Sequence, residues 1–145
     1  MDESSVSRRA PHRDLDRRVA MADLLHENYF RPRDHEGGPY DVRLAIQENR
    51  LAIAVSDGEG AHVGLFLLSL TPLRQVFRDY ATVCEGYYAA LTSTPSRVEA
   101  IDVGRRALHN EGSEVLRRRL DGKIDIDFET ARRLFSLICA LRGRG

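Results

Sequence analysis

The spacing of hydrophobic residues changes once along the chain, and this change limits the folds that the chain can adopt. Between Tyr40 and Val55, apolar residues alternate with polar or small ones, which is the period of a strand with one buried face. From Leu73 to Leu91 they recur every three or four residues and therefore occupy one side of a helix. Strands and helices in separate stretches are typical of an α+β fold.

Three strands are expected in the alternating region, and they form a three-stranded antiparallel meander. The first two are joined by the short link Glu48-Asn49-Arg50, which is typical of a hairpin. A second turn is predicted at Asp57-Gly58-Glu59-Gly60. The third strand, Ala61 to Leu70, is apolar on both faces, so we expect it to be the best covered of the three.

Helices are predicted on both sides of the meander. An apolar stripe at helical spacing precedes it and ends before Pro32; its members are Leu15, Val19, Ala22, Leu25 and Tyr29. After the meander, Thr71-Pro72 has the form of a capped helix start, and the helix that follows is expected to pack on the meander.

The last third of the chain adds more helix and one short strand. Ser96 and Glu99 have capping-box spacing and open a helix that we expect to end near Gly112. Residues 113–120 would form a further turn or two, and a short fourth strand is predicted at 124–127. Asp127 would cap the final helix. The predicted order is α-βββ-α-α(-α)-β-α, with three to five helices packed against the meander.

Length and charge place further limits on the protein. A chain of 145 residues is the size of one domain, and we predict a disordered tail at 1–11 and one globular domain at 12–145. The start of the chain does not resemble a signal peptide, and the longest apolar run is too short for a bilayer, so we expect a cytoplasmic protein without a membrane partner. Basic and acidic residues balance at 22 each, which gives no support for a nucleic-acid partner.

Five short stretches resemble one known family. They are Glu36-Gly-Gly-Pro-Tyr40, Leu68-Ser-Leu-Thr-Pro72, Ala100-Ile-Asp-Val-Gly-Arg-Arg106, Leu108-His-Asn-Glu-Gly112 and Phe128-Glu-Thr-Ala-Arg-Arg-Leu-Phe135. In this order they are similar to uncharacterised protein family (UPF) 0262, a set of small bacterial proteins. The resemblance implies a bacterial protein of this size, and it implies no activity and no functional residue.

The segment from Asp102 to Glu111 is the strongest candidate for chemistry. On a helix, Asp102 and His109 share a face, with Arg105 and Arg106 between them. In a functional interpretation His109 carries a proton, Asp102 or Glu111 orients it, and the arginines hold an anion. Asn110 would join this cluster at the end of the helix. In the competing interpretation these residues are ordinary helix-surface pairs, with an Asp102–Arg106 ion pair and a histidine near the helix end.

Other kinds of site have weaker support in the sequence. The histidines are scattered without metal-ligand spacing, so we predict no metal and no cofactor. Cys84 and Cys139 lie in apolar helical patterns and are expected to be buried free thiols. Lys123 is the only lysine in an otherwise arginine-rich set of cations. The densest basic run is Arg117-Arg118-Arg119, which would contact the phosphates of RNA or DNA if it has a function.

Three functions remain open at this point. The absence of a catalytic motif favours a small non-catalytic binding or adaptor protein with an unknown protein partner. The first alternative is an enzyme or small-anion-binding protein that uses the cluster from Asp102 to Glu111. The second alternative is contact with RNA or DNA through the arginine-rich helices.

Overall fold

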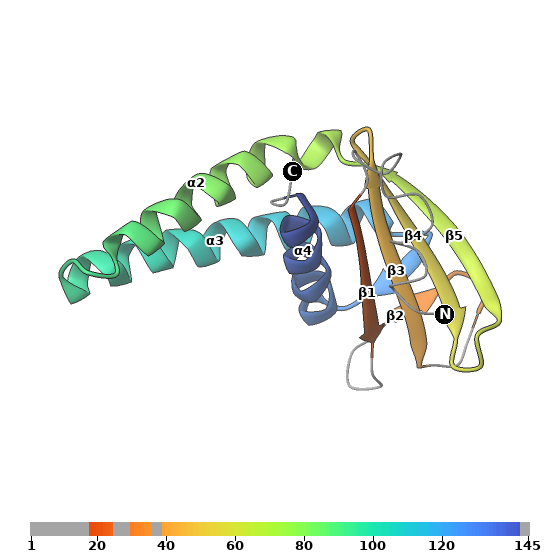
Figure 1. Cartoon of the computed structure of the whole chain (residues 1–145). Coiled ribbons are helices and arrows are strands. Elements are labelled where there is room, and N and C mark those ends of the chain that lie inside the picture. Colours follow the sequence, from red (N-terminus) through yellow and green to blue (C-terminus); the bar gives the residue numbers. More distant parts are fainter. Residues whose placement is uncertain (1–17, 25–29, 36–38, 143–145) are drawn as a thin grey trace.

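The computed structural model describes residues 18–24, 30–35 and 39–142, and it has the predicted α+β fold (Figure 1). Its main sheet has four antiparallel strands in the order β1-β3-β4-β5. These are β1 (Arg18–Leu24), β3 (Tyr40–Gln47), β4 (Arg50–Asp57) and β5 (His62–Ser69). The three α-helices are α2 (Arg74–Ala90), α3 (Pro95–Leu120) and α4 (Phe128–Arg142). Helices α2 and α3 form a long hairpin that projects from the sheet, and α4 contacts both α3 and the sheet (Figure 1).

Strands β3, β4 and β5 form the predicted antiparallel meander. Glu48 and Asn49 both have positive φ angles, 52° and 64°, and they form the two-residue turn that closes the first hairpin. Alternate residues of β3 and β4 point into the core, as their spacing predicts. These buried residues are Tyr40, Val42, Leu44, Ile46, Leu51, Ile53 and Val55.

The prediction that the third strand is the best covered is wrong. Strand β5 lies at an edge of the sheet, and Leu65 and Leu67 on it are 57% and 53% exposed. Leu68, on the opposite face, is buried. An apolar run cannot by itself distinguish a strand covered on both faces from an edge strand with an uncovered apolar face.

The predicted first helix is also wrong, because residues 18–24 form strand β1. The strand pairs with β3 and places Ala20 opposite Leu44 and Ala22 opposite Val42. In the sequence, residues 20, 22 and 24 have the spacing of a strand, while Val19 and Ala22 have the spacing of a helix. The spacing is therefore compatible with both structures, and pairing with the edge of β3 selects the strand. The predicted tail at 1–11 lies outside the described residues.

Helix α2 packs mainly against α3, so the prediction that it packs on the meander is wrong. A 3₁₀ turn, η1 (Thr71–Leu73), leads the chain from β5 into α2. Thr71 is not the cap that its position suggested, and its backbone N–H donates to Ser69 Oγ at 3.2 Å. Only a short connection separates α2 from α3, and such connections favour antiparallel neighbouring helices.

Helix α3 is a single helix of 26 residues, so Gly112 does not end it. Its N-cap is Thr94, whose Oγ1 accepts a hydrogen bond from Arg97 N at 3.3 Å, and the predicted capping box at Ser96 and Glu99 is therefore wrong. Gly112 is enclosed against the ring of Phe135. The glycine therefore serves close packing between α3 and α4.

The predicted short strand and final helix are both present. Strand β6 (Ile124–Ile126) pairs with β2 (Phe30–Pro32) in a second, two-stranded sheet, so it does not join the meander. Asp127 Oδ1 accepts from Thr130 N at 2.9 Å, which confirms the predicted cap of α4. None of the helices in the described part of the chain is long and apolar enough to cross a membrane.

Candidate functional site

Two arginines of α3 share one carboxylate. Arg105 donates to Asp102 Oδ1 from Nε at 2.9 Å and from Nη2 at 2.6 Å, and Arg106 Nε lies 3.1 Å from Asp102 Oδ2. These pairs join residues three and four positions apart on one helix. Arg105 also lies over the ring of Tyr87, at 5.2 Å from its centroid. The hydrogen bonds to Asp102 raise the pKa of Arg105, so the guanidinium group stays protonated.

His109 is buried on α3 between two other helices. Its Nε2 lies 2.7 Å from Ser136 Oγ of α4, and its Nδ1 lies 3.5 Å from Ser113 Oγ. The rings of Phe135 and Tyr80 make T-shaped contacts with the imidazole at centroid distances of 5.0 and 5.5 Å. Burial lowers the pKa of His109, and the charges of Arg132 and Arg105 lower it further. The imidazole is therefore neutral at pH 7.

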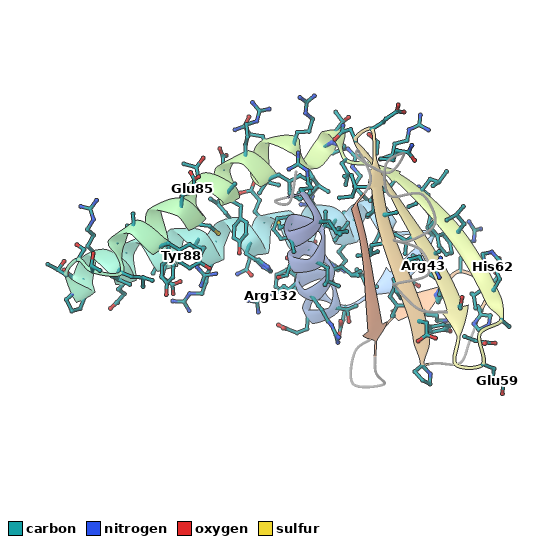
Figure 2. The ribbon with its side chains drawn as sticks, in the orientation of Figure 1. Arg43, Glu59, His62, Glu85, Tyr88 and Arg132 are labelled. Carbon is teal, nitrogen blue, oxygen red and sulfur yellow. The ribbon has the colours of Figure 1, made fainter. Side chains whose placement is uncertain are left out.

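Helix α4 supplies the other side of the site. Its exposed turn brings Arg132, Arg133 and Ser136 to the same cavity as the arginines of α3, and Figure 2 marks Arg132 beside α4. Arg132 Nη1 lies 3.5 Å from Glu129 Oε1, while its Nε is buried and has no hydrogen-bond partner in the described structure. The cavity is open to solvent and has a volume of about 390 Å³; it is lined by Tyr80, Arg105, Arg106, His109, Glu129, Arg132, Arg133 and Ser136.

The structure brings together only part of the predicted cluster. Arg105, Arg106 and His109 line one cavity, and Asp102, which does not line it, is ion-paired to both arginines. Asn110 and Glu111 are exposed and do not line it. Since α3 continues through Gly112, residues 110 and 111 point about 100° and 200° away from His109 around the helix. The expectation that Glu111 or Asp102 orients His109 is therefore wrong, because the imidazole contacts two serines.

The arginine run at 117–119 lies outside this cavity. Arg117 Nη2 lies 2.8 Å from Glu114 Oε2, and Arg118 Nε lies 3.6 Å from the same oxygen. Two of the three positive charges are thus partly compensated by a carboxylate of the same helix, while Arg119 is exposed. This arrangement weakens the case for phosphate contact through the run.

Sequence reasoning missed every member of the site that does not belong to the segment from 102 to 111. These residues are Tyr80, Ser113, Glu129, Arg132, Arg133 and Ser136. One signal was present, because Arg132, Arg133 and Ser136 are three and four positions apart and so share a face of the final helix. Only the packing of α4 on α3 shows that this face meets His109.

The two cysteines are free, as predicted, but they are half-buried and not buried. Both line a second cavity of about 550 Å³ between α2 and α4, together with Phe77, Tyr88 and Arg142. Among the described residues, no three or more His, Cys, Asp or Glu side chains come together in a group that could hold a metal ion.

Comparisons with known proteins give a family but no activity. The chain is 49% identical to a UPF0262 protein of Rhizobium etli over 144 residues, which cover 99% of this chain and 92% of the relative. It is 52% identical to a UPF0262 protein of Brucella anthropi over 145 residues, which cover 99% and 91%. No solved structure matches the chain. The sequence profile of the uncharacterised protein family UPF0262 matches residues 1–144, so the chain belongs to this family, as its short stretches had suggested.

Proposed function

We propose that this protein binds a small doubly charged anion, such as inorganic phosphate or a phosphate monoester, in the cavity between α3 and α4. The observation that supports the proposal is the convergence of four arginines from two helices on one open cavity. The carboxylates bonded to these arginines are Asp102 and Glu129, so four positive charges face two negative ones. An excess of two positive charges matches the charge of a dianion.

The donors available in the cavity suit such a ligand. Guanidinium groups present planar pairs of N–H donors that match the oxygen atoms of phosphate. Arg132 keeps a buried Nε–H without a partner, and Arg133 forms no ion pair with any of the described residues. The hydroxyl of Ser136 and the neutral imidazole of His109 also line the cavity, but they bond to each other, so the arginines supply the donors to the anion.

The competing structural interpretation accounts for only half of this arrangement. It predicts the Asp102–Arg106 ion pair, which is present together with an Asp102–Arg105 pair. It does not account for Arg132 and Arg133, which α4 holds against the same cavity with only a 3.5 Å contact to Glu129. Like charges gathered in one cavity repel each other, and a bound anion would relieve this repulsion.

Isothermal titration calorimetry tests the proposal with inorganic phosphate and phenyl phosphate at low ionic strength. We expect both to bind, and we expect affinity to fall by about tenfold or more in Arg133→Gln, since a charge-assisted hydrogen bond contributes about 1.5–3 kcal/mol. The double variant Arg132→Gln/Arg133→Gln should bind neither compound measurably. The matched control is Arg119→Gln, which removes the same charge from an exposed position outside the cavity.

Two results would contradict the proposal. The first is the absence of binding heat for both compounds to the folded wild-type protein. The second is an equal loss of affinity in Arg119→Gln and Arg133→Gln, because this would show a general charge effect rather than a site.

The adaptor function with a protein partner is a second candidate, and one observation favours it. The α2–α3 hairpin extends beyond α4 (Figure 1), and three large apolar residues on it are exposed. They are Tyr88 (71%), which Figure 2 labels, Leu91 (51%) and Val103 (56%). Large apolar residues exposed on a projecting element suit contact with a protein partner. Co-purification from the native bacterium with wild-type protein and with Tyr88→Ser/Val103→Ser tests this function, since a true partner should be lost from the variant.

A further inference from the structure

Ser136 and His109 form a hydroxyl–imidazole pair inside the arginine-lined cavity. The Oγ of Ser136 lies 2.7 Å from Nε2 of His109, a distance typical of a strong hydrogen bond. The serine is exposed on α4, where a ligand in the cavity could reach it, while the histidine is buried behind it on α3. A nucleophile within hydrogen-bond distance of a base is the first requirement for covalent catalysis by serine.

The surroundings of His109 favour the tautomer that accepts a proton from Ser136. Ser113 Oγ donates its own hydrogen to the backbone carbonyl of His109 at 2.7 Å, so its lone pairs are free toward Nδ1, 3.5 Å away. Nδ1 can therefore carry the ring hydrogen, which leaves Nε2 as an acceptor for the hydroxyl of Ser136. The rings of Phe135 and Tyr80 meet the imidazole edge to face and limit its rotation. Burial and the nearby arginines also lower the pKa of His109, which keeps it in the base form at pH 7.

We propose that Ser136 is a nucleophile and His109 its general base, and that the pair transfers the phosphoryl group of a phosphate monoester held by the four arginines. This inference rests on the proposed function, because it requires a phosphate ester in the same cavity. Arg132 and Arg133 lie four and three residues before Ser136 on α4, so they share a helix face with it and line the same cavity. Positive charges beside the attacking oxygen stabilise the charge on the phosphoryl oxygens during transfer.

The reaction balances with water as the second substrate. Ser136 Oγ forms a bond to phosphorus while the bond from phosphorus to the ester oxygen breaks. The proton of the hydroxyl moves to His109 Nε2 and then to the leaving alcohol. In the second half, water attacks the phosphoserine, His109 takes a proton from the water, and the oxygen of Ser136 leaves and recovers that proton. The net change is hydrolysis of the monoester to an alcohol and inorganic phosphate.

The test uses the full chain and p-nitrophenyl phosphate, whose good leaving group removes the need for a particular alcohol. We expect release of nitrophenolate and, in protein quenched early with acid, an adduct with the mass of one phosphoryl group on the peptide that contains Ser136. Ser136→Ala should lose the adduct and the release, yet bind inorganic phosphate within about threefold of the wild type. Ser96→Ala, at an exposed serine outside the cavity, is the matched control and should react like the wild type.

His109→Gln separates the base from the nucleophile. We expect this variant to react on the order of a hundredfold more slowly, with little change in phosphate affinity. Circular dichroism and the melting temperature establish whether the variant folds, and Ser136→Ala carries the test if it does not, because Ser136 is exposed.

Different results would overturn different conclusions. If phosphate binds but neither adduct nor release is seen, the catalytic inference fails and the proposed function stands. If phosphate does not bind to the folded protein, both fail. Release that persists in Ser136→Ala overturns the role of Ser136, and reaction with p-nitrophenyl acetate but not with the phosphate overturns the assignment to phosphoryl transfer.

Discussion

Gly112 of α3 and Phe135 of α4 are in direct contact, and a Cβ atom at position 112 would overlap the ring carbons of Phe135. Both residues are buried where the two helices meet. His109 lies one turn before Gly112, and Ser136 follows Phe135 directly. The glycine thus allows the close approach of α3 and α4 that brings the imidazole and the hydroxyl within 2.7 Å.

Gly112→Ala is therefore expected to destabilise the protein. Alanine favours a helix over glycine by about 1 kcal/mol, but overpacking of a filled core costs typically about 1–3 kcal/mol, and the rigid ring of Phe135 cannot move aside cheaply. The control is Gly104→Ala on the same helix, where a Cβ would meet no atom within 4 Å and where we expect unchanged or slightly higher stability. Urea unfolding measures both, and equal stability of the two variants would contradict this account of Gly112.

The contrast between predicted and observed structure has a physical pattern. The meander was predictable from residue spacing, because its strands β3 and β4 each have one buried face. The strand β1 was not, since its apolar residues fit both periods and only pairing with β3 selects one. Gly112 was misread because a glycine that breaks a helix and a glycine that allows a close crossing look identical in the sequence.

The candidate site was predictable only on its α3 side. Positions 102, 105, 106 and 109 share a helix face, and local spacing alone placed the arginines beside Asp102. The α4 side depends on which face of the last helix meets His109, and that is a long-range contact. Glu111 and Asn110 were included because the helix was expected to end near them, and its continuation turns them away from the cavity.

Protonation of His109 should reduce stability. Its pKa is lowered in the folded protein, so the unfolded chain binds more protons once pH falls to the pKa of an ordinary histidine, about 6.5. The contribution is present above that value and is lost as pH decreases toward the lower pKa of the folded state. Unfolding free energy measured between about pH 8 and pH 5 should decrease more steeply in the wild type than in His109→Gln. Parallel profiles would show that the imidazole is not held neutral by burial.

Cys139 should react slowly with thiol reagents in the folded protein. Burial raises the pKa of its thiol to about 12, whereas an ordinary cysteine has a pKa near 8.5. At pH 8 its reactive thiolate is therefore scarcer by on the order of a thousandfold. Cys84→Ser leaves Cys139 as the only thiol, and alkylation by iodoacetamide followed by mass spectrometry gives its rate in buffer and in urea. Comparable rates in the two conditions would mean that the thiol is accessible in the folded chain.

Asp102→Asn tests whether the carboxylate of Asp102 opposes anion binding or prepares the site for it. The amide keeps an oxygen that can accept from Arg105 but removes the negative charge shared by Arg105 and Arg106. Because a unit charge a few ångströms away contributes about 1 kcal/mol in water, we expect phosphate to bind a few times more tightly at low salt. The gain should shrink as salt is added, since screening weakens the field of the freed guanidinium groups. The same variant should unfold at a slightly lower urea concentration, because two partly exposed ion pairs are lost.

Calorimetry at two salt concentrations measures the change in phosphate affinity. Weaker binding in Asp102→Asn would contradict this expectation. It would show that Asp102 orients the arginines for the ligand, and that this orientation contributes more to affinity than the repulsion between its carboxylate and the anion removes.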